Sequence, residues 1–295
     1  MYTRLDSCPN CGHTELANDR IIVDHSISKE SFALSRCKSC DFLFTNPRPS
    51  DENLGKYYES EDYISHTNNG NGLINRLYKA VRTVTLRQKV NLIKSYQPEK
   101  GALLDIGCGT GHFLGAAQKA GWRITGVEPD SGARKIAEQE TSKPIYSSIQ
   151  EVPEEGKYNV VTLWHVLEHL SNLGGTLKKL KAVTTKESTL VIAVPNHTSW
   201  DGQHYGENWA GYDVPRHLYH FRKETMASLM KRHGFRVIER KPMVFDAYYV
   251  SLLSEQYKTG SKRLLSAFRS GWKSNRWAKK NDLEYSSVIY IIKRK

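Results

Sequence analysis

A short loop with three glycines constrains the chain more than any other stretch of its sequence. The loop follows a brief apolar run that ends at Asp105, and its glycines are Gly107, Gly109 and Gly111. Glycine permits positive φ angles and a close approach of backbone to ligand, so this spacing predicts a ligand-binding turn between a strand and a helix. Dinucleotide sites have the different pattern G-x-G-x-x-G, and no Walker lysine follows here. A carboxylate at Asp105 favours a ligand with an ammonium group over one with a pyrophosphate.

A second acidic residue indicates that the ligand contains a ribose. Residues 121–127 are predicted to form a strand that ends at Glu128. Glu128 comes about 20 residues after Gly107, the separation at which an acidic residue reaches ribose hydroxyls in nucleotide-binding α/β folds. A ligand with an amino-acid head and a ribose, such as S-adenosylmethionine, satisfies both observations.

The loop and the second acidic residue together resemble the class I S-adenosylmethionine-dependent methyltransferases. The family's D-x-G-x-G-x-G pattern is matched by Asp105 and the three glycines, and its following acidic residue by Glu128. The resemblance implies an α/β fold with a Rossmann-like, seven-stranded core whose seventh strand is antiparallel. It also implies that Asp105 faces the ammonium side of the methionine moiety, that the glycines approach the nucleoside and that Glu128 binds the ribose.

Three further cofactor contacts are implied by position. Ile149 follows the third expected strand, where family members contact adenine, although a core residue would show the same periodicity. Tyr58 and Tyr63 precede the first strand, where related enzymes cover the methionine end of the cofactor. Packing of tyrosines on a connector helix is the alternative.

The rest of the core alternates between strands and helices, as a doubly wound sheet requires. Helices are expected at about 111–120 and 130–140, and another follows the fourth strand. The expected strands are 101–106, 123–128, 144–147, 158–164, 189–194, 235–240 and 287–292.

Four of the five cysteines form two C-x-x-C pairs, Cys8 with Cys11 and Cys37 with Cys40. Two such pairs suit a tetrahedral zinc site with no open position, so the predicted zinc is structural. A β-hairpin of residues 21–25 and 31–34 would bridge the pairs. Disulfides are the alternative, which a reducing cytosol disfavours.

These features predict three parts of the chain. A zinc-ribbon-like module spans 1–50, and a helical connector that covers the cofactor spans 51–97. The methyltransferase domain spans 98–295, with insertions at 195–221 and 246–281.

Acid–base chemistry is predicted directly after the fourth strand, at His165, Glu168 and His169. On a helical turn this spacing places all three on one face, where they are suited to remove a proton from an acceptor. The spacing also resembles the metal-binding E-x-x-E-H motif of ubiquinone-pathway O-methyltransferases and of small-RNA 2′-O-methyltransferases. Glu168 and His169 match that motif, but His165 replaces its first glutamate, and magnesium prefers oxygen ligands. Local capping and hydrogen bonding is the third alternative.

The segment 195–221 is rich in aromatic residues and histidines, and long segments of this kind are usually functional. We expect it to form the wall of the acceptor pocket, with His217 as a second candidate base or metal ligand. A histidine that only fixes the loop by hydrogen bonds is the alternative. The segment resembles bacterial methyltransferases with an N-terminal zinc motif, some of them from sugar and cell-surface pathways. The expected acceptor is therefore small or carrier-linked, such as a sugar or another hydroxylated metabolite.

The net charge of +12 favours anionic partners, and much of the excess lies after residue 257. Nucleic-acid binding through the zinc ribbon and this basic region is the main alternative function, and a cofactor-binding protein without catalysis is another. The insertion 246–281 combines an apolar stripe with basic residues, which suits contact with an anionic membrane or packing on the core or a second subunit. No apolar run reaches the roughly 18 residues of a membrane span, and the N-terminus is polar, so a cytoplasmic location is expected. The sequence does not predict the oligomeric state.

Overall fold

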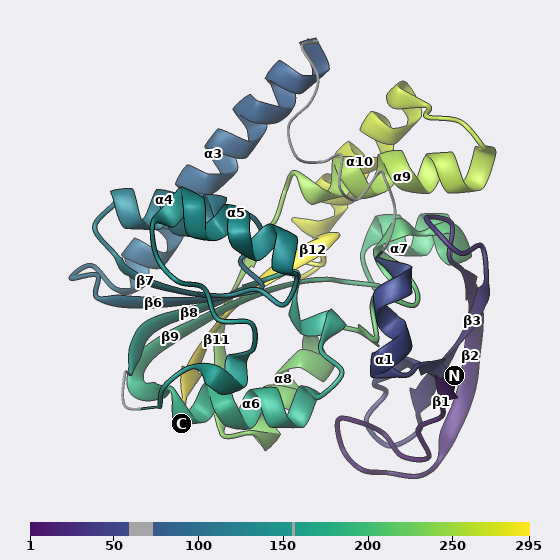
Figure 1. Ribbon diagram of the computed structural model, residues 1–295. Helices are drawn as coiled ribbons and strands as arrows, with labels where there is room; N and C mark the ends of the chain where they lie inside the picture. Colours follow the sequence, from purple (N-terminus) through teal and green to yellow (C-terminus); the bar gives the residue numbers. More distant parts are fainter. Residues whose placement is uncertain (59–72, 155–156) are drawn as a thin grey trace. The chain divides into compact units, whose positions relative to one another are not determined.

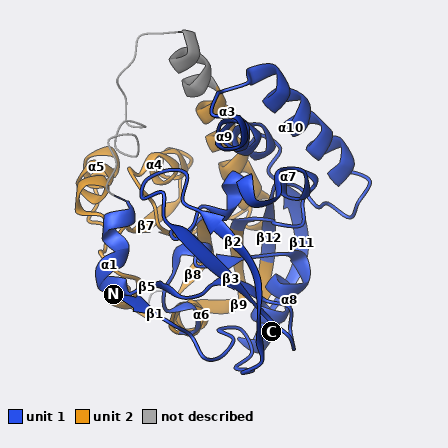
Figure 2. Cartoon of the chain, turned by 90° about the vertical axis from the view of Figure 1, so that its right-hand side faces the viewer, with its two compact units in different colours: residues 1–63, 165–174, 193–291 blue, residues 64–164, 175–192, 292–295 orange. Residues whose placement is uncertain are grey.

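The computed structural model describes residues 1–58, 73–154 and 157–295, and of residues 73–80 only the backbone. Tyr63 lies outside the described residues. The chain divides into two compact units, neither of which is one continuous stretch (Figure 2). Unit 1 contains residues 1–63, 165–174 and 193–291, and unit 2 contains residues 64–164, 175–192 and 292–295. The predicted boundaries at residues 50 and 97 stay a prediction.

Unit 2 is built on parallel strands. Strand β6 (Ala102–Ile106) pairs in parallel with β7 (Arg123–Val127) on one side and with β8 (Tyr158–Trp164) on the other. Side chains along β6 and β8 are buried on both faces, as is typical of parallel sheets covered by helices. Helices α3 (Leu73–Tyr96), α4 (His112–Lys119) and α5 (Ser131–Thr141) lie on one face, and α6 (Leu173–Ala182) lies on the other (Figure 1).

The main sheet has the strand order β11-β12-β9-β8-β6-β7. Its remaining members are β9 (Thr184–Pro195), β11 (Phe235–Pro242) and β12 (Ser287–Arg294). The predicted Rossmann-like α/β alternation is therefore confirmed. One strand differs: within the described residues the sheet has six strands, and the expected third strand is a single bridge between Val127 and Tyr146. Pro144 provides no N–H for a longer ladder, and a 3₁₀ turn follows at Ile149–Glu151.

Unit 1 contains a four-stranded sheet of order β10-β4-β3-β2. Strands β2 (Leu16–Val23) and β3 (Ser31–Cys37) form the predicted antiparallel hairpin, with Ile22 opposite Phe32. Strand β4 (Leu43–Thr45) continues the sheet, and β10 (Tyr219–His220), far away in sequence, completes it. A two-stranded sheet joins β1 (Tyr2–Thr3) to β5 (Arg48–Pro49).

The hairpin and the segment 195–221 share one hydrophobic core. Ile22, Phe32 and Tyr57 pack in a single cluster with Trp209 and Tyr212. The aromatic residues of 195–221 that the sequence suggested for a pocket wall thus include core residues. Their backbone forms α7 (Trp200–Tyr205) and 3₁₀ turns at Gly206–Asn208 and Ala210–Tyr212.

The remaining helices of unit 1 are short or lie late in the chain. Helix α1 (Asp51–Leu54) runs into a 3₁₀ turn at Gly55–Tyr57. Helix α8 (Lys223–Arg232) precedes β11, and the insertion 246–281 forms α9 (Asp246–Thr259) and α10 (Leu264–Ala278). Within the described residues, no helix is both long enough and apolar enough to span a bilayer.

Candidate functional site

The glycine loop of unit 2 has the backbone that the sequence predicts. Gly107, Gly109 and Gly111 have φ angles of 68°, 53° and 79°, a region that side chains strongly disfavour. A Cβ on Gly111 would lie 2.8 Å from the Cα of Ala137, so this glycine lets the start of α4 approach α5. A Cβ on Gly109 would meet no atom within 4 Å. Packing therefore explains Gly111, whereas Gly109 leaves backbone open to a ligand.

Two buried carboxylates flank this loop. Asp105 accepts a hydrogen bond from the Thr162 hydroxyl at 2.5 Å, and burial raises its pKa to about 7. Glu128 accepts hydrogen bonds from the backbone N–H of Gly109 at 2.8 Å and of Asp130 at 2.9 Å. Burial also raises the pKa of Glu128, against the opposing effect of these two donors. Glu128 thus holds the loop as well as standing where a ribose is expected.

The other residues predicted to contact the cofactor have different surroundings. Ile149 is buried at the start of a 3₁₀ turn in unit 2, so core packing and adenine contact both stay open. Tyr58 belongs to unit 1, where its hydroxyl lies 3.0 Å from Nδ1 of His169.

All four predicted catalytic residues lie in unit 1, in one cluster. His165 follows the end of β8 and has a φ of 58°, and a 3₁₀ turn follows at Leu167–His169. Nδ1 of His165 lies 3.4 Å from Oε1 of Glu168. His217 arrives from the segment 195–221, and its Nε2 lies 4.0 Å from the same oxygen. A backbone hydrogen bond of 2.7 Å from Leu218 to the carbonyl of Glu168 joins the two segments.

Glu168 is the most unusual group in this cluster. Its side chain is fully buried, and neither carboxylate oxygen has a hydrogen-bond partner. Burial raises the pKa of Glu168, but His165, His217 and His169 outweigh that effect and lower it. The group is therefore held as a carboxylate whose oxygens have no hydrogen bond besides the 3.4 Å ion pair of Oε1 with His165, which is rare for a buried charge.

His165 and His169 have pKa values shifted in opposite directions, and hydrogen bonds fix the tautomer of His169 and His217. Burial favours neutral His165, but hydrogen bonding to Asp246 and interaction with Glu168 outweigh this and raise its pKa to about 10. Burial and the neighbouring His217 lower the pKa of His169 to about 4. Nδ1 of His169 lies 3.0 Å from the carbonyl of Arg216, and Nδ1 of His217 lies 3.0 Å from that of Gly211. Because a carbonyl only accepts, both Nδ1 atoms carry the proton, and in the neutral rings Nε2 is left as an acceptor.

Sequence reasoning missed the groups that support this cluster. Asp246, at the start of α9, lies 2.9 Å from Nε2 of His165, and no motif marks it. Arg216 is buried between Asp24 of the β2–β3 turn, at 3.0 Å, and Asp213, at 2.7 Å. This double ion pair ties the segment before β10 to the N-terminal hairpin, a contact that only the tertiary structure shows.

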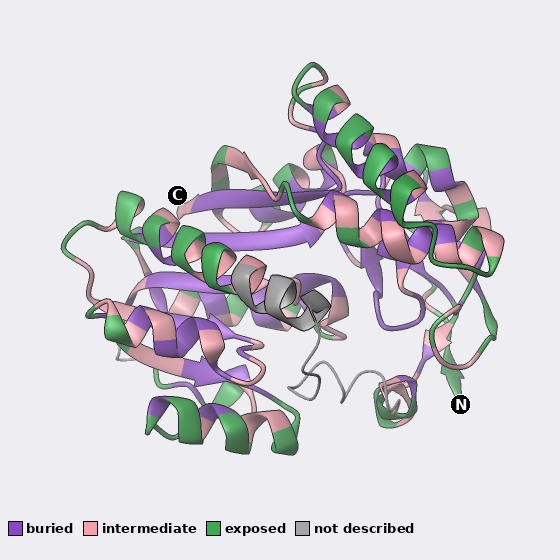
Figure 3. Cartoon of the chain, turned by 90° about the horizontal axis from the view of Figure 1, so that it is seen from above, coloured by how far each residue is buried: buried purple, intermediate pink, exposed green. Residues whose placement is uncertain are grey.

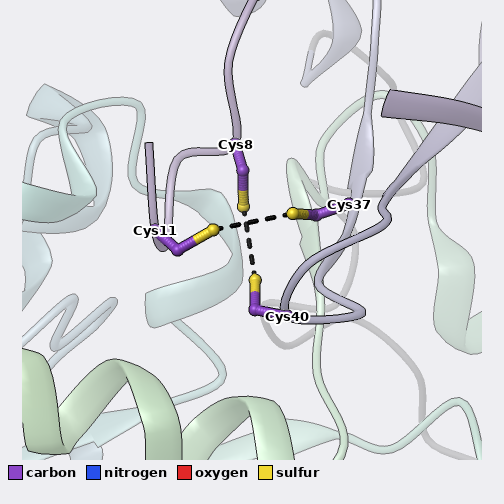
Figure 4. Close-up of side chains that lie close together, drawn as sticks. All are labelled: Cys8, Cys11, Cys37 and Cys40. Atoms are coloured by element: carbon purple, nitrogen blue, oxygen red, sulfur yellow. Dashed lines mark hydrogen bonds between the residues drawn. The ribbon is translucent and has the colours of Figure 1, made fainter. Parts of the chain in front are cut away.

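The four cysteines of the C-x-x-C pairs converge at one end of the hairpin (Figure 4). The Sγ atoms of Cys8 and Cys40, and those of Cys11 and Cys37, are 3.6 Å apart, and all four thiols are free. A tetrahedron with zinc–sulfur bonds of about 2.3 Å has edges of about 3.8 Å, so this arrangement fits zinc and is too wide for disulfides.

A second group of three potential metal ligands is formed by Glu168, His169 and His217. One ligand atom from each lies within 4.8 Å of the others. Two imidazoles and one carboxylate suit a transition-metal ion better than magnesium. Both Nδ1–H groups donate to backbone carbonyls, the support that metal-ligating histidines usually have.

The fold and the glycine loop define a class I methyltransferase, as the sequence predicts. A methyltransferase domain family model matches residues 78–240, more than half of the chain, and the chain belongs to that family.

The chain also has distant similarity to named proteins and solved structures. A ubiquinone biosynthesis O-methyltransferase of Rhodopseudomonas palustris strain HaA2 is 24% identical over 161 residues, which cover 49% of this chain and 62% of the relative. One of Azorhizobium caulinodans is 28% identical over 184 residues, covering 56% and 71%. Among solved structures, magnesium protoporphyrin IX methyltransferase of Synechocystis PCC 6803, with bound S-adenosylhomocysteine, superposes with a TM-score of 0.53 at 14% identity, covering 81% of this chain and 97% of that chain. The structural likeness supports the fold alone.

Proposed function

We propose that this protein transfers a methyl group from S-adenosylmethionine to a hydroxyl oxygen of a small or carrier-linked acceptor. The family supports methyl transfer, and both named relatives are O-methyltransferases. One observation supports methyl transfer to an oxygen atom. The buried carboxylate of Glu168 accepts no hydrogen bond and is surrounded by histidines. Methyl transfer to a hydroxyl requires removal of one proton, and this cluster offers acceptors for it.

The cofactor would be held by unit 2. Asp105 would face the ammonium group, the open backbone at Gly109 would approach the nucleoside, and Glu128 would accept from the ribose hydroxyls. Ile149 is the candidate for the adenine contact. Bound S-adenosylmethionine supplies an electrophilic methyl carbon on a sulfonium, so the protein must mainly align that carbon with the acceptor oxygen.

Within the cluster, the pKa of about 10 changes the role that we assign to His165. A histidine that is already protonated at neutral pH cannot accept a proton, so His165 serves to fix Glu168 and balance its charge. We assign proton removal to His217, whose Nε2 lies 4.0 Å from the Glu168 carboxylate. The carboxylate stabilises the imidazolium that forms when the acceptor hydroxyl loses its proton.

A divalent transition-metal ion on Glu168, His169 and His217 is a second mode for the same cluster. The two carboxylate oxygens, which accept no hydrogen bond, and the fixed tautomers favour it. Such an ion would lower the pKa of the acceptor hydroxyl. In that mode His169 and His217 act as ligands, and His165 still holds Glu168.

We also propose that Cys8, Cys11, Cys37 and Cys40 hold one structural zinc ion. Metal analysis of the purified protein should give one zinc per chain. Cys11→Ser should lower that content and destabilise the hairpin, whereas Cys108→Ser, at a free cysteine outside the cluster, should retain it. If removal of zinc from the wild-type protein left its melting temperature unchanged, this assignment would be contradicted.

The proposed activity is tested with methyl-labelled S-adenosylmethionine against hydroxylated metabolites, nucleotide sugars, lipid-linked glycans and RNA. Glu168→Gln removes the charge at the cluster, and Glu187→Gln at an exposed position is the matched control. We expect label on an oxygen of one non-nucleic-acid acceptor, and this label should be lost in Glu168→Gln only. Label on nitrogen or carbon, on RNA alone, or equally with both variants would contradict it. Repeating the assay after chelation and re-addition of Mn²⁺, Zn²⁺ or Co²⁺ separates the metal-assisted mode from the metal-free one.

A further inference from the structure

Helix α10 has one face of small residues that packs inside unit 1. Ala267, Gly271 and Ala278 belong to this face and are buried, and α10 packs on α9 and α7. A Cβ on Gly271 would lie 2.7 Å from the Tyr248 ring and 3.0 Å from the carbonyl of Ala247. This close approach fixes the rotation of α10 about its axis, and with it the side chains that point away from unit 1.

The large apolar residues of α10 are on the outside. Leu264, Leu265, Phe268 and Trp272 are 67%, 79%, 62% and 47% exposed. Figure 3 shows the chain coloured by burial, with exposed positions recurring along its helices. At about 100° per residue, their spacing places them on one stripe of the helix. Seven of the fourteen exposed large apolar side chains that the structure describes lie between residues 244 and 272. Such clustering marks an interaction surface, because scattered exposed apolar residues are ordinary.

Basic residues border the apolar stripe. Arg269, Lys273 and Arg276 follow i, i+4, i+7 spacing and are exposed, and the Arg276 guanidinium lies 5.2 Å from the centre of the Trp272 ring. No acidic residue occurs from 256 to 281. Among the ion pairs of the described residues, none involves a basic residue of α10. Within the described residues, the positive charge beside the stripe is therefore not offset by an ion pair, and the carboxylates of Glu255 and Asp201 instead accept hydrogen bonds from Ser266 and Ser274 of α10.

We propose that α10 binds the surface of an anionic lipid bilayer, with Leu264, Leu265, Phe268 and Trp272 inserted at the level of the headgroups. Charge complementarity selects this occupant, since each Lys or Arg near an anionic surface contributes to binding. The leucines distinguish it from a nucleic-acid surface, which would use stacking aromatics rather than aliphatic side chains. The helix lies in the interface and does not cross the bilayer. This binding is independent of the proposed methyl transfer.

The test is co-sedimentation of the full-length protein with vesicles of phosphatidylcholine alone and of phosphatidylcholine with phosphatidylglycerol. The protein should bind the anionic vesicles, and raised salt should weaken that binding. Leu265→Ser/Phe268→Ser should weaken it at least about tenfold. The control Val84→Ser/Ile136→Ser, at exposed apolar residues of unit 2, should leave it unchanged.

Substitution of two basic residues and a measurement of tryptophan fluorescence complete the experiment. Arg269→Gln/Lys273→Gln should weaken binding about tenfold, whereas Lys231→Gln/Arg232→Gln at the end of α8 should not. Anionic vesicles should shift tryptophan emission to shorter wavelength, and Trp272→Phe should remove most of the shift. Thermal melts of every variant exclude unfolding as the cause of lost binding.

Three results would overturn the proposal. The first is no binding to anionic vesicles, or equal binding by wild type and the Leu265/Phe268 variant. The second is a vesicle-free dimer that the same variant converts to a monomer, which would make the stripe a surface between two copies. The third is binding of RNA that depends on Arg269 and Lys273 while anionic vesicles are not bound.

Discussion

The glycine loop of unit 2 and the histidine–glutamate cluster of unit 1 are assembled in opposite ways. The loop comes from one stretch, residues 105–128, and is fixed by bonds within that stretch, such as the one from Gly109 to Glu128. The cluster draws on four distant segments, around Tyr58, Glu168, His217 and Asp246. A cofactor site that lies within one stretch can be identified from a sequence motif. A site assembled from distant segments can change its chemistry without any change in a motif.

The pKa values of their buried carboxylates are also shifted in opposite directions. Asp105, with one hydroxyl donor, has a pKa raised by burial to about 7. The pKa of Glu168, equally buried, is lowered because three histidines surround it. Desolvation dominates the pKa of Asp105, and neighbouring charge dominates the pKa of Glu168. Substitutions in the two regions should therefore have separable effects.

The largest effect is expected from Glu168→Gln. Loss of the carboxylate that stabilises the proton-accepting histidine should lower turnover about 100- to 10,000-fold. Affinity for S-adenosylhomocysteine should stay within about twofold of wild type, since proton transfer contributes little to cofactor binding. Turnover is measured with the acceptor found by labelling, and affinity by calorimetry. A variant that loses cofactor affinity and turnover together would contradict the separation.

Arg216→Met should strongly destabilise unit 1. It leaves Asp24 buried without its cation, and breaking a buried ion pair costs about 3–5 kcal/mol. Arg240→Met, which breaks an ion pair to the exposed Asp282, should cost less than about 1 kcal/mol. Chemical denaturation followed by circular dichroism measures both. Equal effects of the two substitutions would show that the pair around Arg216 is not what holds the segment to the hairpin.

In the loop, Gly111→Ala and Gly109→Ala should separate packing from ligand contact. The Cβ added by Gly111→Ala would clash with the backbone of Ala137, so this substitution should cost about 2–3 kcal/mol of stability. Gly109→Ala has open space and should cost about 1 kcal/mol, from its positive φ alone, while weakening S-adenosylhomocysteine about tenfold or more. Unchanged affinity in Gly109→Ala, at full folding, would remove Gly109 from the cofactor site.

The effect that is smallest near neutral pH concerns His197. Burial and nearby arginines lower the pKa of His197 to about 4, below the ordinary value of 6.5. The unfolded state therefore binds more protons between these values, and stability falls as the pH drops from 6.5 towards 4. His197→Asn should flatten this fall by roughly 3 kcal/mol. Denaturation curves at several pH values measure it, with His13→Asn at an exposed histidine as control; equal slopes in all three proteins would contradict the assignment.

The sequence predicts what is local in this molecule. The strands β6, β7 and β8, the hairpin and the convergence of the cysteine pairs all follow from neighbouring residues. The third expected strand is reduced to a single bridge next to Pro144, because the apolar stretch there is too short to continue a ladder. The joining of β10 to β4, the burial of Trp209 and Tyr212, and the support of His165 by Asp246 depend on contacts between remote segments. Periodicity carries no information about them.

The most direct test of the account is calorimetry with S-adenosylhomocysteine on three proteins: wild type, Glu128→Ala and Glu168→Gln. Wild type and Glu168→Gln should bind with similar affinity. Glu128→Ala should bind at least about tenfold more weakly, because it removes both the ribose acceptor and the partner of Gly109. No binding by the folded wild-type protein, or equal affinity in wild type and Glu128→Ala, would contradict the central claim that the glycine loop is the methyl-donor site.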